Sequence, residues 1–344
     1  MNTLSEFLWG TPDEVAARAR ADVPSFRLVN PAGDLPPATC PFALPPKGTP
    51  GGSGVSPLLT PKGPSGGSGV SPLLTPKGPP GGSGVSPLQR NGHRVGTTWE
   101  DAHAVYCCLA GVLPPDLSAP RGAQATAIFP EMETLLAEAG MTFAHVVRTW
   151  LYIDRVCEWY GEFNAARSAF FETRNVFNTF LPASTGIGSA NLEGAAIMAG
   201  AIAVKPKSAA VHAEIVESPL QAPAMAYRSS FSRAAESLWP ERRLLFVSGT
   251  ASIEPNSHEV AFVGDIEKQV DCTMKAVYAI LESRGYGWAD VSRAIVYLKE
   301  PSFRAAWQAW LAARGLPSDF AAETVCDVCR DEWLFEIELD AERT

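Results

Sequence analysis

The chain has 344 residues, of which 46% are apolar, and a formal net charge of −9 at pH 7. This length allows two ordinary domains, and the composition allows a sizeable buried core. The acidic balance, without a long basic run, argues against nucleic acid and anionic membranes as the main partners.

Neither a membrane span nor a signal peptide is expected. No run of about 18 apolar residues occurs in the chain, and residues 1–20 lack an apolar segment of the signal-peptide kind. The cysteines are odd in number and irregularly spaced, which predicts reduced thiols in a cytoplasmic protein. They are Cys40, Cys107, Cys108, Cys157, Cys272, Cys326 and Cys329.

A Gly/Pro/Ser-rich repeat dominates the front of the chain. Residues 51–65 and 66–80 differ only in their last residue, and a third copy begins as GGSGVSPL at 81–88. A repeat without aromatic residues cannot bury enough surface to offset the entropy lost on ordering. We therefore predict a disordered linker over residues 36–94, preceded by an N-terminal segment, 1–35, that joins the first folded unit.

Two similar units are predicted after the linker, over residues 95–210 and 211–344. The block AGMTFAHVVRTWLYI (139–153) aligns without gaps to RGYGWADVSRAIVYL (284–298), and each block ends in an apolar strand pattern. Strand and helix patterns surround both blocks in the same order. We expect an α+β fold of two fused β-β-α-β-α-β units, with helices packed on one face of each sheet.

The expected elements of the first unit, besides its block, are strands at 104–112 and 195–204 and helices at 122–140 and 159–175. Those of the second unit are strands at 243–252 and 333–340 and helices at 265–285 and 302–315. The first helix of each unit shows an apolar stripe at helical spacing.

Side chains of the first block divide between two strand faces. Arg148, Trp150 and Tyr152 share one face of VVRTWLYI, and Thr149 and Leu151 share the other. A cation beside two aromatic rings suits a cleft that holds a planar anion. An edge arginine whose stem lies over exposed aromatic rings explains the same pattern, so both interpretations stay open.

A C-x-x-C pair, Cys326 and Cys329, precedes the last strand, WLFEIELD. In an extended chain the two thiols point to opposite faces, whereas zinc needs ligands that converge. A redox pair of the thioredoxin type needs a following helix, but a strand follows here. We therefore predict neither a metal site nor a dithiol site.

Cys329 and Glu336 are the pair of interest if the intervening RDEW segment makes a tight turn. The thiol and the carboxyl would then share a cleft, where a buried carboxyl can keep its proton and act as a general acid. A small buried thiol and a solvated glutamate explain the same residues without any function.

These patterns resemble known proteins. The β-β-α-β-α-β unit that ends in FEIE resembles the YjgF/RidA family of small trimeric proteins. Two fused units with VVRTWLYI, LPASTGIGS and LLFVSGTASI resemble the chorismatase family over residues 96–344. The resemblance implies a tandem YjgF/RidA-like (chorismate-mutase-like) fold and removal of the enolpyruvyl group of chorismate as pyruvate, with no metal and no cofactor.

The resemblance also implies a subtype and a mechanism. The first Glu of the E-I-E motif, Glu336 here, is the acid that protonates the enol-ether methylene. Cys329 and Gly249 match the hydroxybenzoate-forming type, whereas the diol-forming type carries Ala at both positions. In the former type the substrate's 4-hydroxyl displaces the side chain, and the thiol helps to open the resulting arene oxide. The expected product is 3-hydroxybenzoate, with some 4-hydroxybenzoate.

Substrate contacts are implied at further positions of the matching motifs. They are Arg148, Tyr152, Arg167, Thr185, Gly186, Arg233, Gly249 and Thr250. The chain departs from the family in the repeat insertion and at Leu151, where Asn is frequent. The expected oligomeric state is a monomer or a homotrimer.

Two other functions remain open at this point. The single-unit relatives deaminate imines and enamines and use an arginine shortly before the E-I-E strand, as Arg330 is here. A catalytically silent ligand-binding scaffold, with the Pro/Gly repeats as its interaction arm, is the other.

Overall fold

The computed structural model describes residues 86–227, 229–255 and 257–344. The predicted segment 1–35 and most of the predicted linker lie outside the described residues. None of the helices in the described part is long and apolar enough to cross a membrane.

The first unit is a six-stranded sheet with the order β1-β2-β3-β6-β4-β5. Neighbouring strands are antiparallel except β4 and β5, which are parallel. The strands are β1 (Ser86–Arg90), β2 (His93–Glu100), β3 (Ala104–Val112), β4 (Val146–Ile153), β5 (Ala183–Gly188) and β6 (Ile197–Pro206). The helices are α4 (Arg121–Glu138), α5 (Val156–Thr173), α6 (Val176–Thr179) and the 3₁₀ turn η2 (Phe143–His145).

The second unit repeats this plan with the order β11-β10-β12-β9-β8-β7. Here β10 and β11 form the parallel pair. The strands are β7 (His212–Val216), β8 (Ala234–Trp239), β9 (Arg242–Ala251), β10 (Val291–Leu298), β11 (Ala322–Val325) and β12 (Phe335–Arg343). The helices are α7 (Ile266–Ser283), α8 (Arg304–Ala313) and the 3₁₀ turns η3 (Ala224–Tyr227), η4 (Trp288–Asp290) and η5 (Pro301–Phe303).

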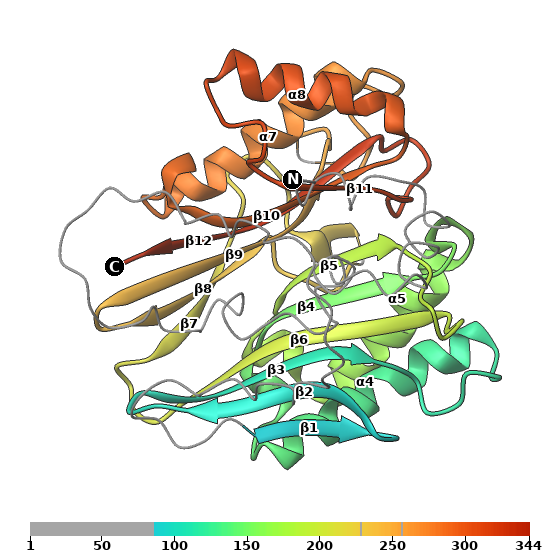
Figure 1. Cartoon of the computed structure of the whole chain (residues 1–344), viewed down its shortest axis with the longest axis vertical. Coiled ribbons are helices and arrows are strands. Elements are labelled where there is room, and N and C mark those ends of the chain that lie inside the picture. Colours follow the sequence, from blue (N-terminus) through green and yellow to red (C-terminus); the bar gives the residue numbers. More distant parts are fainter. Residues whose placement is uncertain (1–85, 228, 256) are drawn as a thin grey trace, which may run out of the picture.

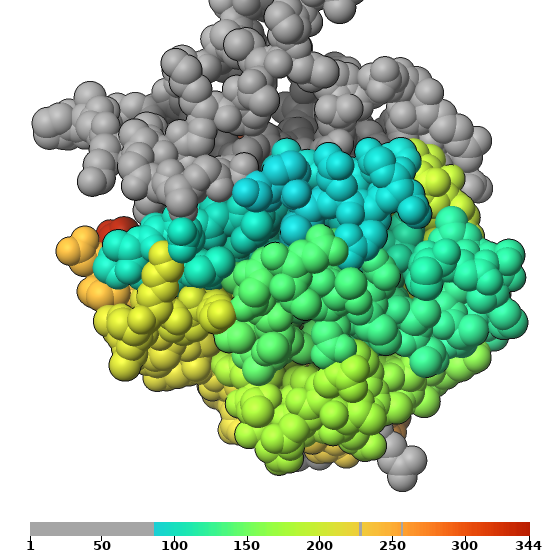
Figure 2. Space-filling view, turned by 90° about the horizontal axis from the view of Figure 1, so that it is seen from below, coloured from blue at the N-terminus to red at the C-terminus, as the bar shows by residue number. Residues whose placement is uncertain are grey.

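Three buried cores hold four layers together. Phe129 and Phe163 belong to a core between α4, α5 and the first sheet, and Trp307 belongs to one between α7, α8 and the second sheet. A third core, with Phe246 and Trp333, lies between the two sheets. The sheets therefore face each other, with the helices on the outer sides (Figure 1). Figure 2 shows the outside of the first unit from below, where the blue β1–β2 hairpin borders the green helical segments.

The predicted α+β fold of two units, each with helices on one face of its sheet, is confirmed. Each unit nevertheless has six strands, two more than the four of the predicted β-β-α-β-α-β pattern, and the additional strands are β1 and β5 in the first unit and β7 and β11 in the second. All four are short strands of four to six residues. Such segments offer too few residues to establish a period-two pattern.

The first strand lies inside the range predicted to be linker, so the predicted linker end at residue 94 is too late. The last three residues of the third repeat copy, 86–88, open β1, and Leu88 is buried in the first core. Asn91 and Gly92 have positive φ angles of 51° and 80° and join β1 to β2 as a two-residue turn. An Asn-Gly turn of this kind is a strong hairpin signal, which the repeat composition had obscured.

Candidate active site

A pocket lies where the two units meet, with an empty volume of about 520 Å³ that includes its open mouth. The first unit contributes Tyr160, Arg167, Ser184 and Gly186 to its lining. The second unit contributes Ser229, Phe231, Arg233, Gly249, Ala251, Ile253, Cys329, Arg330, Trp333 and Glu336.

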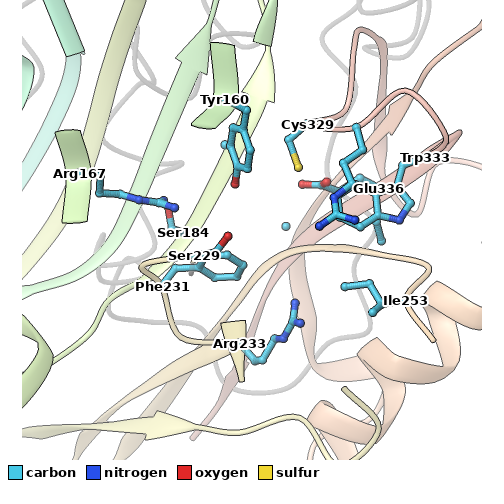
Figure 3. Close-up of a pocket in the computed structure, with 14 residues that line it drawn as sticks. Tyr160, Arg167, Ser184, Ser229, Phe231, Arg233, Ile253, Cys329, Trp333 and Glu336 are labelled. Carbon is cyan, nitrogen blue, oxygen red and sulfur yellow. The ribbon is translucent and has the colours of Figure 1, made fainter. Parts of the chain in front are cut away.

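The spacing of residues along helices and strands explains why the main side chains of the pocket lie together. Tyr160 and Arg167 are two turns apart on α5 and therefore share a face. Gly249 and Ala251 are two residues apart on β9 and therefore share a face of the second sheet. Glu336, on β12, is paired with Ala251 across the antiparallel ladder, so its carboxyl lies on the same side. Figure 3 shows Tyr160, Cys329 and Glu336 gathered at one end of the pocket.

Glu336 has the chemistry of a general acid. Its side chain is only 5% exposed, and burial, followed by the charge of Glu338, raises the pKa of its carboxyl to about 8. The charges of Arg148 and Arg233 act in the opposite direction without outweighing the burial. The carboxyl therefore holds its proton at neutral pH, which a proton donor requires.

Gly249 leaves room for this carboxyl. A Cβ atom built on Gly249 would lie 2.1 Å from Glu336 Oε1 and 3.1 Å from the Thr185 methyl carbon. The backbone N–H of Gly249 donates to Thr185 Oγ1 at 3.0 Å, which fixes β9 against β5 here. Any side chain at residue 249 would displace the acid.

Cys329 lies beside Glu336, as the sequence predicts, and Cys326 does not line the pocket. β11 ends at Val325, so both cysteines occupy a connection and not a strand. Trp333 N–H donates to the Arg330 carbonyl at 3.3 Å and closes the expected turn. Cys326 is buried in the core between the sheets. Cys329 also packs against that core, but of the two thiols it is the one that lines the pocket, although the premise of one extended strand was wrong.

Contacts from the first unit hold this connection in place. The backbone N–H of Gly188 donates to the Asp327 carbonyl at 2.7 Å, and Cys157 Sγ donates to the Val328 carbonyl at 3.1 Å. Burial raises the pKa of the Cys329 thiol, as does the charge of Glu336, while a hydrogen bond with Tyr160 opposes the shift. Cys329 is therefore a protonated thiol at neutral pH.

Three guanidinium groups give the pocket a positive character. Arg167 and Arg233 are 2% and 3% exposed, and their Cζ atoms lie 5.8 Å and 5.7 Å from the Phe231 ring centre. Figure 3 shows them approaching from two sides, with Phe231 between them. Arg330 donates to the His258 carbonyl at 2.8 Å. Because Glu336 is neutral, the lining favours a ligand with carboxylate groups and a ring.

The structure brings together most of the residues that the sequence singled out. Those in the lining are Glu336, Cys329, Arg167, Gly186, Arg233 and Gly249. Thr185 packs behind Gly249, and the Thr250 hydroxyl donates to the Ser248 carbonyl at 2.8 Å within the second sheet. Neither threonine lines the pocket, because alternation along β5 and β9 turns these residues away from Gly186 and Gly249.

Arg148 and Tyr152 require a correction, because the structure does not place them in the pocket lining. Arg148 is fully buried, and its Nη2 donates to Glu338 Oε2 at 2.8 Å and to Thr185 Oγ1 at 2.6 Å. Tyr152 is packed in the core between the sheets. Strand alternation correctly placed both on one face, but the second sheet covers that face at this point.

Several lining residues were missed. Tyr160 precedes Arg167 by two helical turns, and Phe231 precedes Arg233 by two residues, so helix and strand periods could have added both. Ser229 and Ile253 come from connections between elements, for which the sequence offers no period. Trp333 was expected at the start of the last strand, but β12 begins at Phe335 and Trp333 lies in the connection before it. Arg330, which the sequence connects with the alternative deaminase function, also lies in the lining.

Arg148→Ala should therefore act mainly on stability. The substitution removes one of the two arginine partners of the buried Glu338, and breaking a buried pair costs up to about 3–5 kcal/mol. Urea unfolding followed by circular dichroism measures the loss, with Arg155→Ala as the control because the Arg155 side chain is 68% exposed. Equal stability of the two variants would contradict this structural role.

Comparisons with protein families divide the chain at the same place as the fold. Residues 85–201 match the family model described as chorismatase FkbO/Hyg5-like, N-terminal. Residues 221–343 match the model described as endoribonuclease L-PSP. The pocket takes its lining from both of these regions.

The chain is also similar to individual solved structures. A chorismatase solved at 1.08 Å resolution has a TM-score of 0.58 and 21% identity, over 74% of this chain and 80% of that one. The YjgF gene product of E. coli has a TM-score of 0.30 and 20% identity, over 38% of this chain and 99% of its own.

A RutC family protein from Pyrococcus horikoshii is 39% identical over 56 residues, which are 16% of this chain. The match spans less than half, 44%, of that curated relative. Taken together, the first domain of the chain matches the chorismatase N-terminal model, its second domain matches the L-PSP model, and its two-unit fold is that of a solved chorismatase.

Proposed function

We propose that this protein is a chorismatase that converts chorismate to 3-hydroxybenzoate and pyruvate. The observation that carries the proposal is Glu336, a buried carboxyl with a pKa raised to about 8, placed in one pocket with Cys329 and Gly249. An enol ether needs a proton donor at its methylene carbon, and a carboxyl that keeps its proton at neutral pH supplies one.

Binding of chorismate follows from the positive lining. The substrate has one carboxylate on its ring and another on its enolpyruvyl side chain, and the pocket offers the guanidinium groups of Arg167, Arg233 and Arg330. Phe231 and Tyr160 offer ring faces between these cations and Glu336. Two separated carboxylates allow the pocket to orient the ring as well as to hold it.

In the first step, Glu336 donates its proton to the methylene carbon of the side chain. The substrate's 4-hydroxyl oxygen then bonds to the neighbouring ring carbon, while the bond from that carbon to the ether oxygen breaks. The electron pair of the broken bond becomes part of the pyruvate carbonyl group. The hydroxyl proton passes to the Glu336 carboxylate, so the acid is regenerated and no water is consumed.

In the second step, the arene oxide opens beside Cys329. The carbon–oxygen bond at ring position 4 breaks while the oxygen, which stays on position 3, takes the thiol proton of Cys329. The proton lost from position 3 then returns to the thiolate, which restores both the aromatic ring and the thiol. The protonated thiol of Cys329 is placed to assist this opening, and Tyr160 holds it by a hydrogen bond. The product of this sequence is 3-hydroxybenzoate.

Cys329→Ala should change the products more than it changes the release of pyruvate. Glu336 remains able to protonate the side chain, but the opening of the arene oxide loses its thiol. We expect less 3-hydroxybenzoate and more 4-hydroxybenzoate or unopened intermediate, measured by chromatography.

The matched control is Cys326→Ala, which removes a thiol from the core between the sheets and not from the pocket. It should leave the product ratio unchanged. Equal effects of the two substitutions would remove the special role of Cys329.

Imine or enamine deamination is the second candidate. Arg330 lies in the lining, and the second domain matches the L-PSP model. Parallel assays with chorismate and with a short-lived imine of pyruvate separate the two functions. Pyruvate with an aromatic product from chorismate supports the chorismatase assignment, whereas ammonia release from the imine with chorismate untouched would overturn it.

A further inference from the structure

A buried ionic layer lies behind the pocket wall, between the two sheets. Glu338 is fully buried, and its Oε1 accepts from Arg293 Nη1 at 2.7 Å and from Trp150 Nε1 at 2.8 Å. Its Oε2 accepts from Arg148 Nη2 at 2.8 Å. Glu338 does not line the pocket, yet three donors from two strands hold its carboxylate. The steps of the proposed reaction leave this residue without a role.

This layer lies next to the acid. Glu338 and Glu336 are two residues apart on β12, so their side chains leave the same face of the strand. Arg148 also donates to Thr185 Oγ1 at 2.6 Å, and that oxygen accepts the N–H of Gly249 at 3.0 Å. Gly249 in turn borders the Glu336 carboxyl. A chain of direct contacts therefore leads from Glu338 to the acid.

Charged and titratable groups face Glu336 from every side. They are Glu338 on β12, Arg148 on β4, Tyr297 on β10, Arg233 before β8, Tyr160 on α5, and Cys326, Cys329 and Arg330 in the connection before β12. Among the described residues, Glu338 is the carboxylate paired with Arg148. Arg293 has a second one, since its Nε donates to Asp340 Oδ2 at 2.6 Å.

Removing the charge of Glu338 would therefore leave the charge of Arg148 acting on Glu336 without the carboxylate that now pairs with it. A cation beside a carboxyl favours the ionised form, and the buried surroundings would strengthen that effect. Burial by itself would raise the pKa of Glu338, but Arg293 and Arg148 outweigh it and hold that pKa below its ordinary value. Glu338 is thus a permanent anion at neutral pH.

We propose that Glu338 is a positioning residue of this site, whose carboxylate neutralises Arg148 and thereby keeps Glu336 in its protonated, proton-donating form. The E-I-E sequence then has two carboxylates with opposite tasks. One is ionised and balances the arginines, and the other is neutral and donates. The expected effect of Glu338 on the turnover of chorismate rests on the proposed function, whereas its expected effect on the titration of Glu336 does not.

Glu338→Gln tests the proposal, because the amide keeps the shape and removes the charge. The titration of Glu336 is followed without substrate, by infrared spectroscopy of its protonated carboxyl band, with Glu336→Gln variants to identify that band. We expect the midpoint to fall by about two pH units from its value near 8. Turnover of chorismate at pH 7 should then fall roughly tenfold and recover at lower pH.

Two further variants test the same interaction through the Glu336 titration midpoint. Arg148→Met alone leaves Glu338 without this cation and should move the Glu336 midpoint upward. The double variant Arg148→Met/Glu338→Gln removes both charges and should return the midpoint toward that of the wild type. A merely structural role for Glu338 would not produce opposite shifts from the two single variants.

An unchanged Glu336 midpoint in Glu338→Gln, or the same downward shift in the double variant, would overturn the proposal. If Glu338→Gln fails to fold, comparing Arg148→Met with the double variant provides the same test. A Glu336 midpoint that does not move upward in Arg148→Met would then overturn the proposal. If the wild type leaves chorismate untouched, the proposed function fails, but the substrate-free titration still decides the role of Glu338.

Discussion

Glu336→Gln should lower the release of pyruvate from chorismate by about 10²–10⁴-fold while the protein remains folded. The amide keeps the size of the side chain but cannot deliver a proton to the methylene carbon. Pyruvate is measured by a coupled assay, and circular dichroism checks the fold. Turnover near that of the wild type would exclude Glu336 as the general acid.

The same variant should be more stable than the wild type at alkaline pH. The pKa of Glu336 is raised from 4.5 to about 8 by folding, so between these values the folded protein holds a proton that the unfolded chain has lost. The wild type therefore loses stability as the pH rises through this window, and the amide does not.

Urea unfolding at pH 4 and at pH 8 measures this difference. The two proteins should have similar free energies of unfolding at pH 4, with the variant ahead at pH 8. A variant that is less stable at pH 8 would show that the ionised carboxylate supports the fold, contrary to its buried, proton-holding role.

Gly249→Ala should lower turnover strongly, second only to Glu336→Gln, because the new methyl group would occupy the place of the Glu336 carboxyl. A separation of 2.1 Å between the added Cβ and Oε1 cannot persist, and the end of the glutamate side chain is the group that can move. A displacement of about 1 Å in a reacting group can lower turnover roughly 10²-fold. We expect the variant to fold, to release pyruvate slowly and to form less 3-hydroxybenzoate.

A matched control is Gly161→Ala on α5, where an added Cβ has no atom within 4 Å. This residue follows Tyr160 but has open space beside it, so the substitution should leave turnover unchanged. Steady-state kinetics and product chromatography on both variants make the comparison. Normal turnover in Gly249→Ala would show that the acid does not need the space beside Gly249.

The strand that carries the acid could be predicted from the sequence because FEIELD alternates clearly, and Glu336 lies in the pocket on the expected strand. Arg148 shows the limit of the same reasoning. Alternation gives the face of a side chain, but whether that face borders a pocket or a second sheet depends on how the two units pack. Leu88 shows another limit, since a repeat whose composition is typical of disorder continues into a buried strand.

Product analysis after incubating the purified protein with chorismate tests the assignment most directly. Pyruvate and hydroxybenzoate should form in equal molar amounts without added metal or cofactor, and the hydroxybenzoate should be mainly the 3-isomer. Unchanged chorismate would contradict the chorismatase assignment. Pyruvate accompanied by a dihydrodiol in place of an aromatic acid would contradict the part assigned to Cys329 and Gly249.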